Sequence, residues 1–438
     1  MVFRPSNSGR QSFFSLNSPD RLLLTFFLSF SFFLPFSYNN PFVLLTFLLA
    51  QTLFSCLALY LSRHSSTALF SELKHKHRGL YLLFIAWLLI CCVSYTNAII
   101  INKASDQQVM QGTIRLIFNF LLVLFIFALA KFRHTFAIKQ ETLIINLSLG
   151  CCFMIGIQLY LAHYGPNVSP ENFLSFPLFI GHIRELGFLS LASLCAAYSY
   201  FIFSYSPSIY KKLILISIIF ITATFTIWAG GRTSAASAII TLVLISLLAL
   251  LYKRLNMTQI SIILAMLIAA YFSADALSIF NWNGLGRTLE TIQTASQSVI
   301  QENSAAIETT GRNKIWALSI EGIKSAPLIG HGPYGYRFLE GWFYGMQPHN
   351  IVLQFLIEWG IIGTLLVLGM MFYIAIIGFK QLPSRIKHYD ASYVASLAII
   401  VSLGLNSLTS GAHYNPMPMF YLALAYAYFP FASQTKTT

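Results

Sequence analysis

Residues 311–363 read GRNKIWALSIEGIKSAPLIGHGPYGYRFLEGWFYGMQPHNIVLQFLIEWGIIG, and they end the only long polar segment of a chain that is otherwise almost continuously apolar. The stretch is basic and aromatic, and it turns apolar at the Pro348-His349-Asn350 step. A basic loop that leads into a histidine at the start of an apolar helix is the feature from which we infer fold and function.

The composition indicates an integral membrane protein. Of 438 residues, 56% are hydrophobic and 9% are charged, whereas soluble domains carry about 25% charged residues. The six cysteines fall inside apolar runs and form neither a disulfide framework nor a metal pattern. The net charge of +13 is explained by membrane topology and anionic lipid, so we expect membrane lipids and no nucleic acid as partners.

The apolar runs predict an all-α membrane protein of about 12 transmembrane helices. A helix needs roughly 17–25 apolar residues to cross a hydrocarbon core of ~30 Å. The runs that meet this need lie at about 21–38, 41–62, 79–101, 112–130, 141–162, 183–205, 213–229, 233–252, 259–279, 349–379, 391–408 and 417–431. Because no small-residue cleavage site follows the first run, we expect an uncleaved first helix.

This pattern divides the chain into three parts. Residues 1–279 hold spans 1–9, residues 280–348 form one large outer loop between spans 9 and 10, and residues 349–438 hold spans 10–12. Within the loop we expect helices near 288–307 and 312–325, packed as a lid on the membrane part.

The distribution of basic residues orients the chain. With the N-terminus in the cytoplasm, every inner loop and both tails carry Lys or Arg, as the positive-inside rule requires. The basic residues left outside are mostly arginines, whose planar fork suits phosphate and carboxylate recognition. We therefore expect a multi-pass protein with both termini cytoplasmic and an anion site on the outer side.

Arg232 lies in the sequence WAGGRTS, at a tight turn between spans seven and eight. A charge this close to the bilayer is costly unless it reaches the headgroups or binds a ligand. The amides at the start of the following helix favour an anion at the same place. An arginine held at the outer headgroups is the structural alternative, and we favour anion binding.

Five further basic residues are candidates for anion binding. Arg115 and Arg184 lie at the outer ends of spans four and six, although a carboxylate follows Arg184 directly and could make it structural. Arg312 opens the predicted helix in the outer loop, with Lys314 and Arg337 nearby in the sequence. We expect one or two of the loop residues to bind an anion and the others to form a solvated face.

His349 is the candidate for proton transfer. A neutral imidazole can accept a proton from an attacking hydroxyl, and Asn350 can orient a ring nitrogen. The structural alternative is a buried or helix-capping histidine. Glu358, further down the same helix, is costly there unless it orients a neighbouring helix or contacts an arginine. The weaker histidine candidates are His163, His182, His331 and His413.

The outer segments carry no Asp-x-Asp, no adjacent carboxylates and no His/Cys cluster, and the chain has no nucleotide-binding P-loop. We therefore expect no metal and no cofactor. The arginines then have to stabilise any anionic leaving group.

Three ordered motifs make the chain similar to the O-antigen ligase and polymerase superfamily. They are GGRTS at 230–234, a Gly-Arg…Trp…Pro-Leu-Ile-Gly-His-Gly pattern at 311–332, and Pro-His-Asn…Gln…Glu-Trp-Gly…Gly at 348–363. The resemblance implies a GT-C-like glycosyltransferase of the bacterial inner membrane. Its reaction is inverting, metal-independent transfer of a glycan from undecaprenyl pyrophosphate in the periplasm.

The resemblance also implies roles for the candidate residues. Arg232, with Arg184, Arg312 and Arg115, would hold the pyrophosphate, and His349 would activate the acceptor hydroxyl. Contacts to substrate from Arg337, Lys314 and Asn350 are a further expectation.

Within the family we favour an O-antigen ligase, because the basic lid suits a phosphorylated lipid A-core acceptor. A polymerase that uses a lipid-linked repeat as acceptor is the alternative. A protein O-oligosaccharyltransferase is disfavoured, because little sequence follows the last predicted span. A lipid-linked sugar transporter or flippase is a more distant reading, since we see neither a repeat between halves nor paired broken helices with mid-membrane charges.

Overall fold

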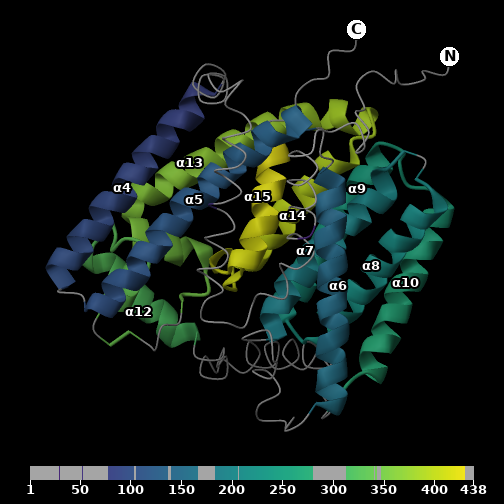
Figure 1. Ribbon diagram of the computed structural model, residues 1–438, viewed down its shortest axis with the longest axis horizontal. Helices are drawn as coiled ribbons and strands as arrows, with labels where there is room; N and C mark the ends of the chain where they lie inside the picture. Colours follow the sequence, from purple (N-terminus) through teal and green to yellow (C-terminus); the bar gives the residue numbers. More distant parts are fainter. Residues whose placement is uncertain are drawn as a thin grey trace, which may run out of the picture.

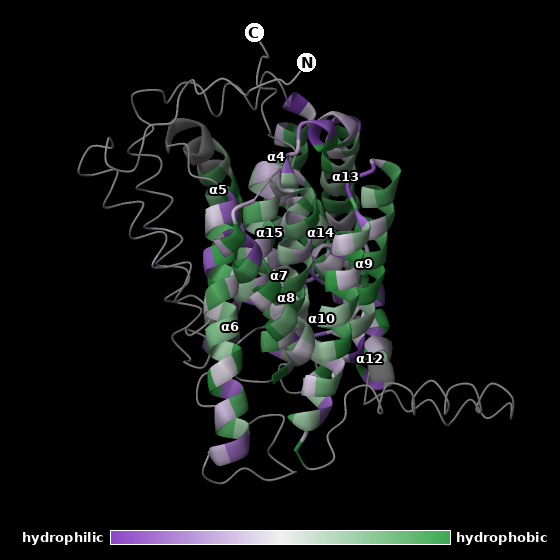
Figure 2. Ribbon diagram, turned by 90° about the vertical axis from the view of Figure 1, so that its right-hand side faces the viewer, coloured by the Kyte–Doolittle hydropathy of each residue, from purple (hydrophilic) through white to green (hydrophobic). Residues whose placement is uncertain are grey.

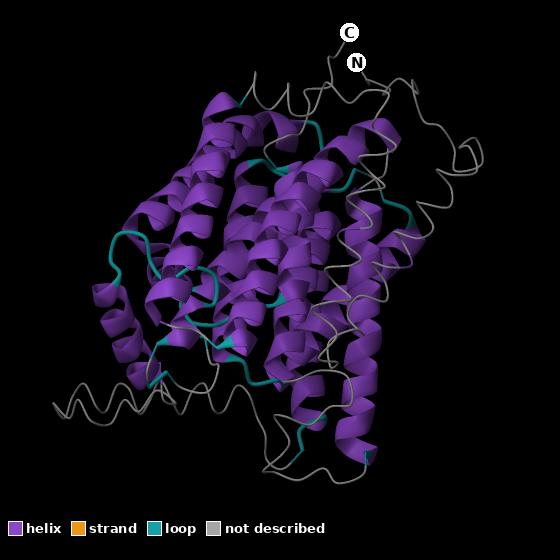
Figure 3. Ribbon diagram, turned by 60° about the vertical axis from the view of Figure 1, so that its left-hand side comes forward, coloured by secondary structure: helices purple, strands orange, loops and turns teal. Residues whose placement is uncertain are grey.

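The computed structural model describes residues 77–102, 105–136, 140–165, 183–205, 207–279, 312–339, 341–342 and 347–429, together with Ser29 and Thr52. Over these residues the chain consists of helices, turns and loops, without a strand (Figure 3). The described part is therefore all-α, as the sequence predicts.

The long helices are connected mostly by short turns. They are α4 (Arg78–Asn102), α5 (Asp106–Phe136), α6 (Gln140–Tyr164), α7 (Ile183–Phe203), α8 (Ile209–Trp228), α9 (Arg232–Leu251), α10 (Met257–Ala276), α13 (Ile351–Lys387), α14 (Ala391–Ser407) and α15 (Pro416–Tyr428). The shorter elements are α12 (Arg312–Ser325) and the 3-10 helices η5 (Gly335–Phe338) and η6 (Ala412–Tyr414). By length and composition, eight of the described helices can cross a membrane, whereas α14 and α15 have 17 and 13 residues.

The helices follow the predicted spans from residue 79 onward, and α12 has the bounds predicted for the second helix of the outer loop. The first two predicted spans, 21–38 and 41–62, and the loop helix near 288–307 lie outside the described residues. The total number of spans therefore stays a prediction. The boundaries of two helices differ clearly, because α5 extends beyond 112–130 at both ends and α13 continues to Lys387 instead of ending near 379. The last turns of α13 are basic, so a hydropathy criterion ends the helix too early.

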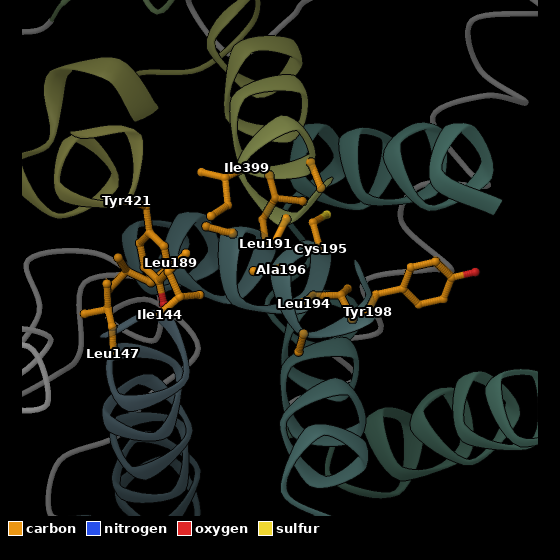
Figure 4. Packing of buried hydrophobic residues seen from close by; sticks show 14 of the residues in the cluster. Ile144, Leu147, Leu189, Leu191, Leu194, Cys195, Ala196, Tyr198, Ile399 and Tyr421 are labelled. Atoms are coloured by element: carbon orange, nitrogen blue, oxygen red, sulfur yellow. The ribbon is translucent and has the colours of Figure 1, made fainter. Parts of the chain in front are cut away.

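α7 lies at the centre of the larger group of helices. Its apolar window is entirely buried, with α6, α8, α9 and α14 packed around it (Figure 1). Figure 4 shows Leu189 of α7 beside Ile144 of α6 and Tyr421 of α15. Several polar groups inside this core are hydrogen-bonded, such as the Tyr421 hydroxyl, 2.5 Å from Ser193 Oγ. A helix that is apolar all round is expected to be buried in this way.

α4, α5, α12 and α13 form a second group, which lies beyond α14 and α15 in Figure 1. α13 packs along α4, α12 packs on α13, and α15 contacts α5. The α4–α13 contact centres on Trp87 and Trp359, whose rings meet edge to face at 5.2 Å. Phe355, one turn before Trp359, stacks on it at 4.6 Å. Aromatic pairs of these geometries add to the energy of burial.

The helix ends carry most of the hydrophilic residues, and the middles are apolar (Figure 2). At one end, Lys211 of α8 lies 2.5 Å from Glu141 of α6, and Arg385 of α13 lies 3.3 Å from Asp390. Arg254, between α9 and α10, donates to carbonyls at the end of α13. We call this the basic end. The predicted inner loops meet here, and the predicted outer loops meet at the opposite end. Which end faces the cytoplasm stays a prediction.

Candidate functional site at the break in α13

α13 is broken at Gly360, which has φ 62° and ψ −170° within the helix. The break leaves backbone groups without helical partners, and residues 327–334 supply them. We call these residues the docking segment. Four hydrogen bonds join the two: His331 N to Ile357 O (2.9 Å), Gly332 N to Glu358 O (2.6 Å), Ile361 N to Pro327 O (2.8 Å) and Ile362 N to Leu328 O (3.1 Å).

Glycine is required where the docking segment meets its neighbours. Gly330 and Gly332 have φ 68° and 76°, a region that other residues adopt at a cost. A Cβ on Gly330 would overlap the backbone at Gly360, and a Cβ on Gly332 would overlap the backbone of Tyr95 in α4. A Cβ on Gly360 would in turn overlap the carbonyl of Leu328. The glycines of the 311–332 and 348–363 motifs therefore allow the two motifs to pack closely against each other.

Glu358 lies just before the break and is 2% exposed. Its Oε1 accepts a hydrogen bond from Tyr334 N at 3.0 Å and another from Gln354 Nε2 at 2.7 Å. A buried carboxylate is costly unless such donors satisfy it. Through Tyr334, Glu358 holds the docking segment, whereas the sequence analysis expected it to orient a neighbouring helix or to contact an arginine.

Tyr334 brings two of the predicted cationic residues together. Its backbone is left-handed, with φ 59° and ψ 6°. The guanidinium carbon of Arg337 lies 4.2 Å from the centre of its ring, and that of Arg115 lies 5.6 Å from it. Arg115 is 4% exposed, and Arg337 donates to Gln111 Oε1 at 2.8 Å. A ring face attracts a guanidinium without neutralising its charge.

His349 is placed by its neighbours at the start of α13. It has φ 53°, a left-handed conformation that persists in non-glycine residues only where the surroundings enforce it. The carbonyl of Pro348 accepts a hydrogen bond from Trp316 Nε1 of α12 at 2.9 Å. Asn350 caps the helix, because its Oδ1 accepts from two first-turn amides at 2.9 and 3.1 Å. This oxygen is used in the cap, so only the amide NH2 of Asn350 is left for a substrate.

His413, in η6, connects the surroundings of Arg115 and His349. It is buried, and its ring meets Phe355 of α13 edge to face at 6.0 Å. Burial, followed by the charge of Arg115 and by electrostatic interaction with His349, lowers the pKa of His413 to about 3. The neutral imidazole therefore lies where α5, α13 and the turn between α14 and α15 meet.

Arg232 begins α9 at the same end of the helices, and its side chain is exposed. The next two residues join α9 to the end of α14. Thr233 Oγ1 lies 2.9 Å from Thr409 Oγ1, and Ser234 Oγ accepts from Asn406 Nδ2 at 3.0 Å. The turn between α14 and α15 thus connects the start of α9 with the surroundings of His349.

For two of the remaining basic candidates the structure describes the backbone alone. Arg184 and Arg312 lie in the first turns of α7 and α12, and their side chains lie outside the described residues. Lys314 is exposed on α12. Further along this helix Lys324 pairs with Glu321 at 3.1 Å, and both side chains are mostly exposed. That part of α12 is a solvated face.

Two of the weaker histidine candidates make contacts between structural elements. His331 Nε2 lies 2.9 Å from the carbonyl of Gly322 and so ties the docking segment to α12. His163 Nε2 lies 3.1 Å from the carbonyl of Leu277, which joins the ends of α6 and α10. His182 lies outside the described residues.

The sequence analysis did not identify Tyr334, and it ranked His413 among the weak candidates. Tyr334 has a local signal, because an aromatic residue in the glycine-rich GHGPYGY is unusual for a plain turn. His413 has none, since its importance comes from helices that are distant in the sequence.

Residues 217–368 match the model of a protein family described as O-antigen ligase. The matched region contains Arg232, the docking segment, His349 and the break in α13. The match supports the predicted membership of the O-antigen ligase and polymerase superfamily. No curated protein matches the chain.

Proposed function

We propose that this chain, a member of the O-antigen ligase and polymerase superfamily, is an inverting membrane glycosyltransferase that moves O-antigen from undecaprenyl pyrophosphate to a lipid A-core sugar. The reaction takes place at the periplasmic face of a bacterial inner membrane. One observation carries the proposal: His413 lies against Phe355 of α13, the helix that His349 precedes, in the turn between α14 and α15. Arg115 of α5 and His349 both contribute to the lowered pKa of His413. The turn that holds His413 also contacts the start of α9, which bears Arg232.

His349 takes the acceptor proton. The acceptor hydroxyl oxygen attacks the anomeric carbon from the face opposite the leaving group, and the bond from that carbon to the pyrophosphate oxygen breaks. Lipid pyrophosphate leaves with the bonding electrons, and the hydroxyl proton passes to the imidazole. The left-handed backbone of His349 supports this role, because enforced conformations of this kind cluster at active sites.

The arginines stabilise the charge that develops on the leaving pyrophosphate, and we propose that no metal or cofactor takes part. Arg232 and the first amides of α9 bind the anion together. The proposed donor site is completed by Arg184, Arg312 and Arg115. Further substrate contacts come from Arg337, Lys314 and the amide nitrogen of Asn350.

We favour the ligase over the polymerase because the sequence of α12 carries Arg312 and Lys314 in its first turn, and α12 reaches the start of α13 through Trp316. A cationic surface there suits an acceptor that carries phosphorylated sugars. A polymerase would use the same donor and the same leaving-group chemistry, with a second lipid-linked repeat as acceptor. The two activities therefore differ in the acceptor alone.

Purified protein tests the proposal directly. The lipid-linked donor is offered with lipid A-core in one reaction and with a second lipid-linked repeat in another, without any ion gradient. We expect transfer to lipid A-core. Chain extension on the lipid-linked repeat alone would establish the polymerase instead. Absence of any product in both reactions, from protein that moves lipid-linked sugar across vesicles, would replace both with a transporter.

A further inference from the structure

The backbone of Tyr334 is held by a buried carboxylate oxygen of Glu358. Glu358 Oε1 accepts from the Tyr334 backbone N–H at 3.0 Å and from Gln354 Nε2 at 2.7 Å. Glu358 belongs to α13, on the His349 side of the break, so the same helix carries His349 at its start and the support of Tyr334 two turns later. The position of the Tyr334 ring is thereby coupled to the position of His349.

The Tyr334 ring in turn positions two positive charges. Arg337 and Arg115 lie 4.2 and 5.6 Å from its centre. Gln111 of α5 also holds the Arg337 guanidinium at 2.8 Å, and the Phe118 ring, 4.9 Å away, shares the positioning of Arg115. Two guanidinium groups around one ring repel each other, and a ring face attracts each of them without removing its charge. An anion between or beside them would be strongly favoured.

The position of this pair relates it to the reaction. Arg115 and His349 act together on His413, so the arginines around Tyr334 lie in the same environment as the proposed proton acceptor. Arg232 begins a different helix, α9, and reaches this environment only through the turn between α14 and α15. The geometry therefore separates an arginine pair around Tyr334 from the Arg232 helix start.

We propose that Tyr334 and Glu358 are positioning residues, which set Arg115 and Arg337 to bind a phosphate-type anion of one substrate. This inference rests on the proposed function. The donor pyrophosphate and a phosphate group of the acceptor are the two possible sources of that anion. Tyr334 contributes its ring face, and Glu358 contributes a hydrogen-bond acceptor for the backbone of Tyr334.

The test compares two pairs of variants in the full-length purified protein. Tyr334→Leu removes the ring and Tyr334→Phe restores it without the hydroxyl. Glu358→Ala removes the acceptor for the Tyr334 amide, whereas Glu358→Gln keeps an oxygen there and removes the charge. For each variant, kcat and the KM of donor and acceptor are measured separately. The inhibition constant of inorganic pyrophosphate and the melting temperature are measured on the same samples.

We expect Tyr334→Leu to raise one KM by about tenfold, and Tyr334→Phe to restore it. The KM that rises identifies the source of the anion, and a weaker inhibition by pyrophosphate accompanies it if that source is the donor. Glu358→Ala should resemble Tyr334→Leu, and Glu358→Gln should resemble wild type.

The inference is overturned if both KM values of Tyr334→Leu equal those of wild type, or if Tyr334→Phe fails to restore them. If Glu358→Gln raises the KM as much as Glu358→Ala does, the charge of the carboxylate is what matters, and not the hydrogen bond that it accepts from Tyr334. Glu358 would then not be a positioning residue for Tyr334. If Glu358→Ala does not fold, the Tyr334 pair decides alone. If the wild-type protein transfers no glycan, the proposed function fails. Direct binding of inorganic pyrophosphate and of inorganic phosphate to wild type, Tyr334→Leu and Tyr334→Phe then tests this inference, and equal binding of both anions by all three proteins overturns it.

Discussion

The two ends of the helices use arginine in different ways. At the basic end, Arg385 lies 3.3 Å from Asp390, and Arg254 donates to main-chain carbonyls at 2.9 and 3.0 Å. At the opposite end, Arg115 and Arg337 lie against the ring of Tyr334. Ring faces hold arginines at both ends, since Arg254 lies 3.5 Å from the centre of the Tyr389 ring and Arg385 lies 5.7 Å from that of Tyr393. The difference is that, among these contacts, two guanidinium groups lie around one ring only where Arg115 and Arg337 flank Tyr334. We take the contacts at the basic end as structural and propose ligand binding for the pair around Tyr334.

Arg232, exposed at the start of α9, lies at the same end of the helices as the Tyr334 pair, and we propose ligand binding for it too. Replacing Arg232 with Ala should lower the rate of glycan transfer by about 10²–10³-fold, the usual effect of removing one group that stabilises developing charge. Arg254→Ala is the matched control at the basic end. It should lower the melting temperature, because it removes contacts to α13, and should retain kcat. Equal losses of activity in both variants would break the comparison between the ends.

A substitution at the break in α13 should have the next largest effect. Gly360→Ala places a Cβ against the Leu328 carbonyl at φ 62°, so we expect a loss of about 2–5 kcal/mol in stability. Gly156→Ala is the matched control, since a Cβ there meets nothing within 4 Å. That variant should change stability by less than about 1 kcal/mol. Thermal unfolding in detergent gives both values, and similar melting temperatures would show that the docking segment does not depend on Gly360.

His413 predicts a pH dependence of stability. Its pKa is lowered to about 3 in the folded protein, against about 6.5 for an unperturbed histidine. Between these values the unfolded chain binds more protons, so this contribution is complete above about pH 6.5 and is lost as the pH falls toward 3. In His413→Asn the melting temperature should fall less between pH 7 and pH 4, by about 2 °C or more. Parallel curves for the two proteins would contradict the buried neutral imidazole.

The smallest effect is expected on the outer face of α12. Lys324 and Glu321 lie 3.1 Å apart with relative exposures of 67% and 70%, and exposed pairs contribute about 0–1 kcal/mol. Lys324→Ala should therefore leave the melting temperature nearly unchanged and alter transfer less than about twofold. A large loss of transfer would extend the ligand-binding region onto this face.

The course of the helices was predictable because burial in a membrane demands long apolar runs, and α12 was predictable from its flanking glycine and proline. The break at Gly360 was not, because the chain is apolar on both sides of it. What allows the break is a set of four hydrogen bonds from residues 327–332, which no local pattern reveals. A fold inferred from hydropathy thus contains α13 as one uninterrupted helix.

Candidate site residues were predictable where a polar side chain is energetically costly at its position beside an apolar span. Arg232 at a tight turn and His349 before an apolar run are examples, and their roles stay proposals. The contacts of Arg115 were not predictable, because Tyr334 reaches it only when η5 packs on α5. The same holds for His413, whose low pKa depends on burial among three separate helices.

The central claim is that His349 takes the acceptor proton in a reaction that needs no metal. The direct measurement is the initial rate of transfer from lipid-linked donor to lipid A-core by purified wild type and by His349→Ala, each with and without EDTA. The melting temperature of both proteins controls for folding. The account predicts a loss of about 10²–10⁴-fold in His349→Ala and no effect of EDTA on wild type. Full activity of folded His349→Ala, or loss of wild-type activity in EDTA, would contradict it.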